Sequence, residues 1–167
     1  MQEKPDATAS PQFVVRKYRR SDRDRVLAIT ADSFGEVCLE ANMEAQFGLI
    51  AGTTWTERKQ DGIDFDLRRY ASHTFVAEAG EEVVGYIATR LYSNVLTGHI
   101  ANMAVDRRFQ GLGIGKGLMQ AALDHFRQEG MQYARIETLE QNPRGQHIYP
   151  SFGFKEVGRQ IFYFREL

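Results

Sequence analysis

The chain has 167 residues and a formal net charge of -1 at pH 7, with 43% hydrophobic and 26% charged residues. This length fits one globular domain, and the near-neutral charge argues against a dedicated nucleic-acid-binding protein, which normally carries a strong basic excess. Cys38 is the only cysteine, so an intrachain disulfide is excluded and a reducing cytoplasm is the expected location. We find neither a signal peptide nor the roughly 18 apolar residues of a membrane span, so we expect no membrane partner.

The first third of the chain predicts two helices and a poorly defined stretch. Residues 1–11 are small and polar and predict a disordered leader ahead of a single domain over residues 12–167. Residues 13–15 predict a short strand, and Ser21 and Asp24 then predict the start of a helix that reaches about Gly35. Apolar side chains at positions 39, 43, 47 and 50 predict a second helix. Residues 52–62 predict a loop and residues 65–70 a short helix.

The apolar pattern then changes to the alternation of strands. Residues 74–78 and 83–92 flank a short polar turn and predict a hairpin, and residues 100–105 predict the next strand. A helix over residues 114–127 is ended by Gly130. The remaining elements are a strand over 133–138, a short helix over 143–152, and strands over 154–157 and 161–164. Strands come in runs, which is typical of an α+β or mixed α/β fold.

A glycine-rich turn between the strand and the helix predicts an anion site. The segment is Gln110-Gly-Leu-Gly-Ile-Gly-Lys116. Glycines let the backbone approach a phosphate closely, and the free amides at the start of the helix point at it. The spacing excludes a P-loop, because Gln110 stands in place of the first glycine and Gly117 follows the lysine. It also excludes the dinucleotide fingerprint, whose third glycine would be Lys116 or Leu118.

What the turn does match is Gln-x-x-Gly-x-Gly, at Gln110, Gly113 and Gly115. This resembles the acetyl-CoA motif of the GNAT superfamily of N-acetyltransferases, which is Arg/Gln-x-x-Gly-x-Gly/Ala. The alternative is a turn that holds no ligand. Three glycines at alternate positions weaken a helix start by up to ~1 kcal/mol each, which favours a functional purpose.

A second motif lies downstream, in Asn-x-x-Gly-x-x-Ile-Tyr-x-x-Phe-Gly-Phe over residues 142–154. It resembles the family's Asn-x-x-Ala-x-x-Leu-Tyr-x-x-x-Gly-Phe. Gly145 replaces the usual alanine, which should loosen the short helix, and Pro150 directly after Tyr149 should kink or shift it. The two motifs and the strands around them cover about residues 74–155, whereas residues 36–72 have no counterpart in the family pattern.

The resemblance implies a mostly antiparallel central sheet flanked by helices. Its fourth strand (residues 99–106) and fifth strand (residues 133–140) would splay apart to form a slot for acetyl-CoA. Backbone groups of Met103 and Val105 would bind the thioester carbonyl and the pantetheine arm, and the amides of residues 111–116 would hold the pyrophosphate. The implied cofactor-binding residues are Met103, Ala104, Val105, Gln110, Gly111, Leu112, Gly113, Ile114, Gly115, Lys116, Asn142 and Tyr149.

Acetyl transfer from a thioester to an amine needs an oxyanion donor, an acid for the departing thiolate and a base for the amine. The Met103 amide is the candidate oxyanion donor. Tyr149 is the candidate acid at the family's tyrosine position, and its alternative role is a core aromatic. Glu137 and His99 are alternative bases, since ribosomal-protein N-terminal acetyltransferases and histone-acetylating members place a base at these respective positions. A water chain is the third possibility, and Glu140 lies close enough to reach the same slot.

The predicted function is therefore transfer of an acetyl group from acetyl-CoA to a primary amine, on a small molecule or a protein, by direct attack in a ternary complex. The alternative is a non-catalytic acyl-CoA-binding or sensory module on the same fold. The exposed C-terminal strands favour a homodimer. The histidines have no metal-ligand spacing, so no metal is predicted.

Overall fold

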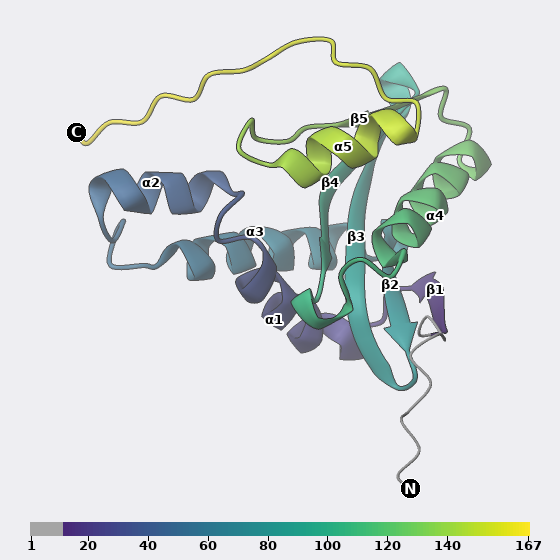
Figure 1. Ribbon diagram of the computed structural model, residues 1–167. Helices are drawn as coiled ribbons and strands as arrows, with labels where there is room; N and C mark the ends of the chain where they lie inside the picture. Colours follow the sequence, from purple (N-terminus) through teal and green to yellow (C-terminus); the bar gives the residue numbers. More distant parts are fainter. Residues whose placement is uncertain (1–11) are drawn as a thin grey trace, which may run out of the picture.

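The computed structural model describes residues 12–167, so the predicted leader lies outside the described residues. The strands are β1 (Phe13–Lys17), β2 (Thr74–Ala79), β3 (Glu82–Tyr92), β4 (Thr97–Val105) and β5 (Tyr133–Ile136). The helices are α1 (Arg23–Ser33), α2 (Leu39–Phe47), α3 (Trp55–Arg69), α4 (Ile114–Gln128) and α5 (Pro143–Ser151). Figure 1 shows how helices and strands combine into the predicted α+β architecture. No helix within residues 12–167 has both the length and the apolar character needed to cross a bilayer.

The strands form one sheet in the order β1-β2-β3-β4-β5. Successive strands are antiparallel as far as β4, and β4 and β5 are parallel. The predicted hairpin is confirmed as β2 and β3, and Gly80 in its turn has a φ of +63°, which glycine adopts without strain. The mostly antiparallel sheet is therefore also confirmed.

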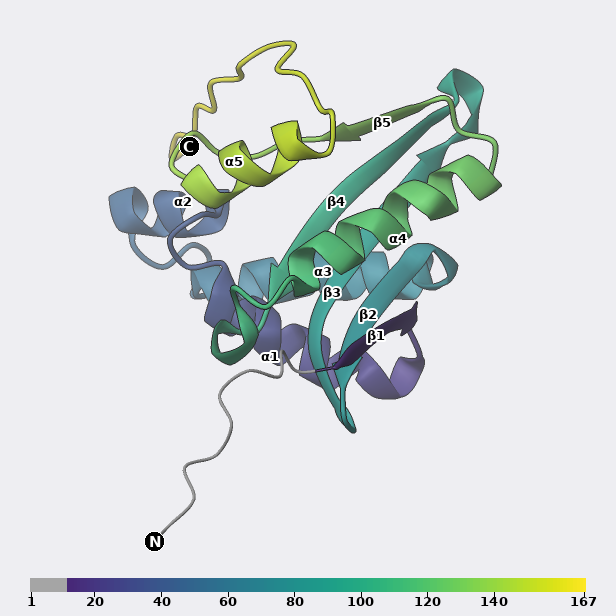
Figure 2. The same ribbon diagram turned by 45° about the vertical axis from the view of Figure 1, so that its right-hand side comes forward.

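Helices cover both faces of the sheet, so that it has two apolar cores. Figure 2 shows α4 on one side of the sheet and α1 and α3 on the other. The core on the α4 side includes Ile100 and Leu118, with Tyr149 from α5 packed at its edge. The core on the other side includes Ile63 from α3 and Ala104 from β4. The two faces of β4 thus meet different helices.

Strands β4 and β5 separate after a short paired stretch. Their pairing runs from Thr97–Tyr133 to Ile100–Ile136, whereas β4 continues to Val105. The prediction that the fourth and fifth strands splay apart is confirmed, although β5 ends two residues earlier than predicted.

A β-bulge lies where the two strands separate. Ala88 and Thr89 of β3 pair with Asn102 and Ile100 of β4, which leaves Ala101 as the extra residue. A bulge of this kind bends its strand and increases the local twist, so it redirects β4 at the point where β5 ends.

The predicted loop over residues 52–62 is wrong, because α3 begins at Trp55 and continues unbroken to Arg69. A capping box starts this helix. The Thr54 hydroxyl accepts from the Glu57 amide, and the Glu57 carboxylate accepts from the Thr54 amide. The predicted short helix over residues 65–70 is the second half of α3. Gly62 lies on its exposed side, where a glycine in mid-helix is tolerated.

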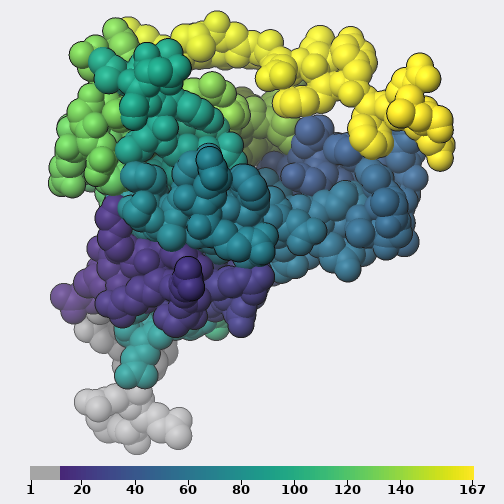
Figure 3. Space-filling model, turned by 180° about the vertical axis from the view of Figure 1, so that it is seen from behind, coloured from purple at the N-terminus to yellow at the C-terminus, as the bar shows by residue number. Residues whose placement is uncertain are grey.

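The predicted strands over residues 154–157 and 161–164 are also wrong, because no strand or helix forms after α5. The segment crosses above α5 toward α2, where the Phe164 ring meets the Phe47 ring edge-on at 5.1 Å (Figure 1). In the space-filling view it arches over a hollow in the surface (Figure 3). Ile161 and Phe162 are 74% and 51% exposed. Their alternation fits a strand, but a strand forms only where a neighbouring backbone supplies hydrogen bonds.

A pair of histidines connects the start of β2 to α4. His73 Nδ1 lies 2.9 Å from His125 Nε2. Burial lowers the pKa of both side chains, Lys17 adds to the lowering, and Glu129 opposes it. Both rings are therefore held mainly in the neutral form, in which one nitrogen donates and the other accepts.

We expect the free energy of unfolding to fall as the pH drops below about 6.5, the usual histidine pKa. A histidine with a lowered pKa binds fewer protons in the folded state, so acid favours the unfolded state. Two protonated rings cannot hydrogen-bond each other, which costs about 1 kcal/mol. Urea unfolding at pH 8 and pH 5 measures the difference. His125→Gln should reduce it and His147→Gln, at an exposed position of α5, should not; the same pH dependence in wild type and His125→Gln would contradict this prediction.

Candidate active site

The open stretch of β4 presents backbone groups to the gap left by β5. The Asp106 amide donates to the Val84 carbonyl of β3 at 2.9 Å. Backbone groups of a strand alternate in direction, so Ala104 also faces β3, whereas Met103 and Val105 face away from it. Because β5 ends opposite Ile100, no strand pairs with Met103 or Val105 among the described residues. These are the backbone groups that the sequence predicted for thioester and pantetheine contacts.

The glycine-rich turn leads from β4 into α4. Gly111 and Gly113 have φ values of +82° and +83°, which an L side chain rarely adopts. Gly113 is the N-cap of α4, and its carbonyl accepts from the Gly117 amide at 3.0 Å. The amides of Ile114, Gly115 and residue 116 belong to the first turn, where a helix has no internal acceptor for them. They are oriented to bind an anion, helped by the helix dipole.

Gly115 lies where β4, α4 and α5 meet. A Cβ atom built there would have only ordinary contacts, at 3.9 Å to Ile148 of α5 and 4.0 Å to Val105 of β4. Its side-chain direction therefore points into the space between these elements. No packing contact inside the protein requires a glycine at this position, which leaves close approach of a ligand as the reason for it.

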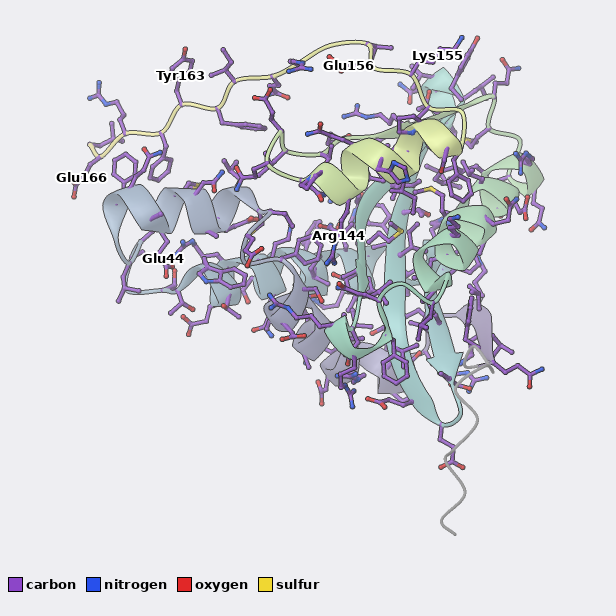
Figure 4. The ribbon with its side chains drawn as sticks, in the orientation of Figure 1. Glu44, Arg144, Lys155, Glu156, Tyr163 and Glu166 are labelled. Carbon is purple, nitrogen blue, oxygen red and sulfur yellow. The ribbon has the colours of Figure 1, made fainter. Side chains whose placement is uncertain are left out.

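Gln110 connects the turn to α5. Its side-chain nitrogen donates to the Val105 carbonyl at 3.0 Å, and its oxygen accepts from Arg144. Figure 4 shows Arg144 between α5 and the strands. Gln110 thus fixes the two walls of the slot relative to each other. The neighbouring Arg107 and Arg108 point elsewhere, since they contact the Asp32 carbonyl and the Asp106 and Glu82 carboxylates.

The second motif forms a tightly packed helix start. The Asn142 side chain accepts from the Gly145 amide at 3.2 Å and donates to the Thr138 hydroxyl at 2.9 Å. A Cβ atom at Gly145 would lie 2.9 Å from Asn142 and Thr138 and 3.0 Å from the Tyr149 ring. The glycine therefore permits closer packing rather than loosening the helix. Pro150 lies in the last turn, and α5 continues past it to Ser151.

Tyr149 lies at the edge of the core on the α4 side, with its ring 6.3 Å from Phe154. Burial raises the pKa of its phenol, and the Thr138 hydroxyl opposes the rise. The phenol therefore keeps its proton at neutral pH. This protonation state suits both the predicted acid role and the alternative role of a packed aromatic.

His99 and Glu137, predicted as alternative bases, form a pair. His99 Nε2 lies 2.9 Å from Glu137 Oε1, and the ring stacks on Tyr92 at 6.0 Å. His99 is 6% exposed, so the alternative of a surface residue at a strand end is wrong. Burial lowers the pKa of His99 and the Glu137 carboxylate opposes that effect. Its second nitrogen, Nδ1, is buried and has no hydrogen-bond partner among residues 12–167.

Glu140, the other carboxylate considered, contacts Arg159 of the C-terminal segment at 2.7 Å. His99 and Glu137 are thus brought together by β4 and β5, whereas Glu140 is directed to a different partner.

Comparison with known proteins identifies this arrangement. A sequence model of the acetyltransferase (GNAT) family matches residues 31–154, most of the chain. The chain belongs to the GNAT acetyltransferase family. A stretch of 102 residues is 34% identical to an N-alpha-acetyltransferase of Sulfurisphaera tokodaii, and it spans 54% of this chain and 61% of that relative.

Solved GNAT structures have the same fold. Ard1 from Thermoplasma volcanium matches with a TM-score of 0.65 and 26% identity, over 87% of this chain and 84% of that one. The PaiA N-acetyltransferase from Thermoplasma acidophilum, crystallised in complex with coenzyme A, matches with a TM-score of 0.68 and 18% identity, over 86% and 90%.

The GNAT motifs did not predict a polar network on the α3 side of β4. Lys59 Nζ donates to Asn102 Oδ1 at 3.0 Å, and Asn102 Nδ2 lies 3.4 Å from Asp66. Lys59 and Asp66 come from residues 36–72, which have no counterpart in the family pattern. The only signal in the sequence was the position of Asn102 directly before Met103.

Proposed function

We propose that this GNAT protein transfers the acetyl group of acetyl-CoA to a primary amine by direct attack in a ternary complex. The observation that carries the proposal is the open stretch of β4, where Met103 and Val105 present unpaired backbone groups beside the anion-binding turn. Residues of both motifs line this gap. Acetyl-CoA supplies an activated acetyl thioester and a pyrophosphate that matches the free amides of α4.

The two walls of the slot have separate tasks. The amides of the first turn of α4 bind the pyrophosphate, and the backbone of Val105 binds the pantetheine arm. The Met103 amide donates to the carbonyl oxygen as negative charge develops there. Tyr149, held in the protonated form by burial, gives its proton to the departing thiolate.

His99 and Glu137 together accept the proton of the attacking amine. A neutral imidazole is the form that burial favours, and Glu137 orients the ring by accepting from Nε2. The unpartnered Nδ1 then provides the free lone pair. This arrangement makes Glu137 a positioning residue and His99 the base.

A protein N-terminus and a small-molecule amine are both candidate acceptors. The N-alpha-acetyltransferase relative supports the first. We also propose a cytoplasmic location, which rests on the single, buried thiol of Cys38. A homodimer stays a prediction, now based on the exposed apolar side chains of the C-terminal segment rather than on strands.

Incubation with acetyl-CoA and an amine panel, with detection of free thiol, tests the proposal. Tyr149→Phe should lower kcat about 100-fold, the lower end for acid–base catalysis, because a thiolate is a good leaving group. Its affinity for coenzyme A, measured by calorimetry, should change less than about threefold, since a single non-contacting hydroxyl is worth little in binding. Tyr163→Phe, at a position 90% exposed, is the matched control. Coenzyme A binding without amine-dependent thiol release would instead favour the non-catalytic module.

A further inference from the structure

Lys59 occupies an unusual position on α3. Residues 63, 66 and 67 form the buried stripe of this helix, and Lys59 lies one turn before Ile63 on the same stripe. An apolar side chain is expected there. Lys59 is half-buried instead, and its ammonium group reaches β4.

The charge of Lys59 has no carboxylate partner within residues 12–167. Its ammonium group contacts the neutral Asn102 amide at 3.0 Å and lies 4.6 Å from the centre of the Phe34 ring. The other half-buried lysine and arginine side chains each form an ion pair; they are Arg16, Arg25, Arg58 and Arg90. Charged groups removed from water are normally paired, so Lys59 is the exception.

The nearest buried carboxylate is already neutralised. Both oxygens of Asp66 accept from Arg90, at 2.7 and 3.0 Å, and Asp66 is 1% exposed. Asn102 directs its amide nitrogen to Asp66 and its oxygen to Lys59. This network fixes the direction of the Asn102 side chain and leaves one positive charge uncompensated.

That charge lies on the face of the sheet opposite the cofactor turn. Met103 and Val105 pack toward α4, whereas Ala104 belongs to the core beneath α1 and α3. Asn102 lies two residues beyond the last pair of β4 and β5, beside the gap. With acetyl-CoA bound from the α4 and α5 side, an acceptor approaches the thioester from the side of α3.

We infer that Lys59 and Asn102 bind a carboxylate carried by the acceptor, so that the substrates of this protein are amines with a nearby carboxylate. The inference rests on the proposed function and specifies its acceptor. A carboxylate would give Lys59 a charge-assisted hydrogen bond and neutralise it. The shared chemistry has two sources, a free amino acid or a peptide whose N-terminal residue is aspartate or glutamate.

Paired acceptors test the inference on the full chain. Glycine is compared with glycinamide, and an N-terminal aspartyl peptide with its asparaginyl counterpart. We expect kcat/KM to be about 10- to 100-fold higher for the carboxylate member of at least one pair, the range for a hydrogen bond to a charged group. The pair that responds identifies the source. Turnover without a preference in either pair would overturn the inference and leave the proposed function standing.

Lys59→Met keeps the length of the side chain and removes its charge. It should abolish the preference while kcat/KM for the neutral member stays within about threefold, because only the charged group contact is lost. Lys155→Met, in the exposed segment after α5 (Figure 4), should keep the preference. A preference that survives Lys59→Met would overturn the assignment. Lys59→Met should also unfold at an equal or higher temperature, since an unpaired half-buried charge is removed; a marked loss of stability would point to a structural role instead.

Binding provides a measurement that does not need turnover. Calorimetry with coenzyme A-saturated protein compares N-acetylglycine with N-acetylglycinamide, and N-acetylated aspartyl with asparaginyl peptide. Tighter binding of a carboxylate form to wild type, lost in Lys59→Met, supports the inference even if no tested amine is acetylated. Equal binding of both forms in both pairs would overturn it.

Discussion

His99→Gln and Glu137→Gln are each expected to lower kcat/KM by about 10²- to 10⁴-fold, the usual contribution of a positioned base. The two side chains form one hydrogen-bonded unit at 2.9 Å, and each is needed for the other to work. Steady-state kinetics with saturating acetyl-CoA and the best amine of the panel would measure the effect. The Glu140→Gln variant is the matched control, because this carboxylate contacts Arg159 instead of His99.

The double variant distinguishes a coupled pair from two independent groups. Residues that act as one unit have strongly non-additive effects, so His99→Gln with Glu137→Gln should be no more than about threefold worse than the weaker single variant. Multiplied effects would contradict the pair. Unchanged rates in both single variants would favour a water chain.

The pH profile of Glu137→Gln adds a second readout. The Glu137 carboxylate raises the pKa of His99 against the larger lowering caused by burial. Without it, the pKa of His99 should fall further, and the acid limb of the residual activity should shift to lower pH. A shift to higher pH would contradict the assignment of His99 as the base.

The fold was predictable where a local signal matched the final packing. The apolar stripe of α4 and the turn of the β2–β3 hairpin depend on residues close in sequence. The first half of α3 was not recognised because its polar run from 57 to 61 has no apolar period, and only the Thr54–Glu57 capping box indicated its start. The C-terminal strands failed for another reason. Alternating side chains indicate that a segment fits a sheet, but not that a partner strand is available to it.

The candidate site was predictable to a similar extent. Spacing within the turn identified an anion site, because its geometry is set by six neighbouring residues. The contact between His99 and Glu137 depends on the parallel register, which places Arg135 opposite His99 and Glu137 two residues further along the same side. That register is not readable from either strand alone. Lys59 lies on a helix that the family motifs do not cover, so its role could only be inferred from the packing of α3 on β4.

Gly115→Leu is expected to weaken coenzyme A binding by about 100-fold, as the loss of one or two charge-assisted hydrogen bonds predicts. The side-chain direction at this glycine points between Val105 and Ile148. A leucine would therefore occupy the space that the pantetheine and pyrophosphate need. Leucine is a good helix former and replaces a glycine in α4, so the ligand-free protein should remain folded. Calorimetry measures the affinity, and urea unfolding without ligand measures the stability.

Two controls separate blocking of the slot from damage to the helix. Gly115→Ala adds only a methyl group with ordinary contacts, and the family motif accepts alanine here, so affinity should stay within about threefold while helix propensity rises by up to ~1 kcal/mol. Gly62→Leu makes the same exchange on the exposed side of α3, where a Cβ meets no atom within 4 Å, and should leave affinity unchanged. Gly113 is a poorer test, because its φ of +83° strains any replacement. If Gly115→Leu bound coenzyme A as tightly as Gly115→Ala, the pyrophosphate would have to bind elsewhere, and the free amides of α4 would lose their assigned role.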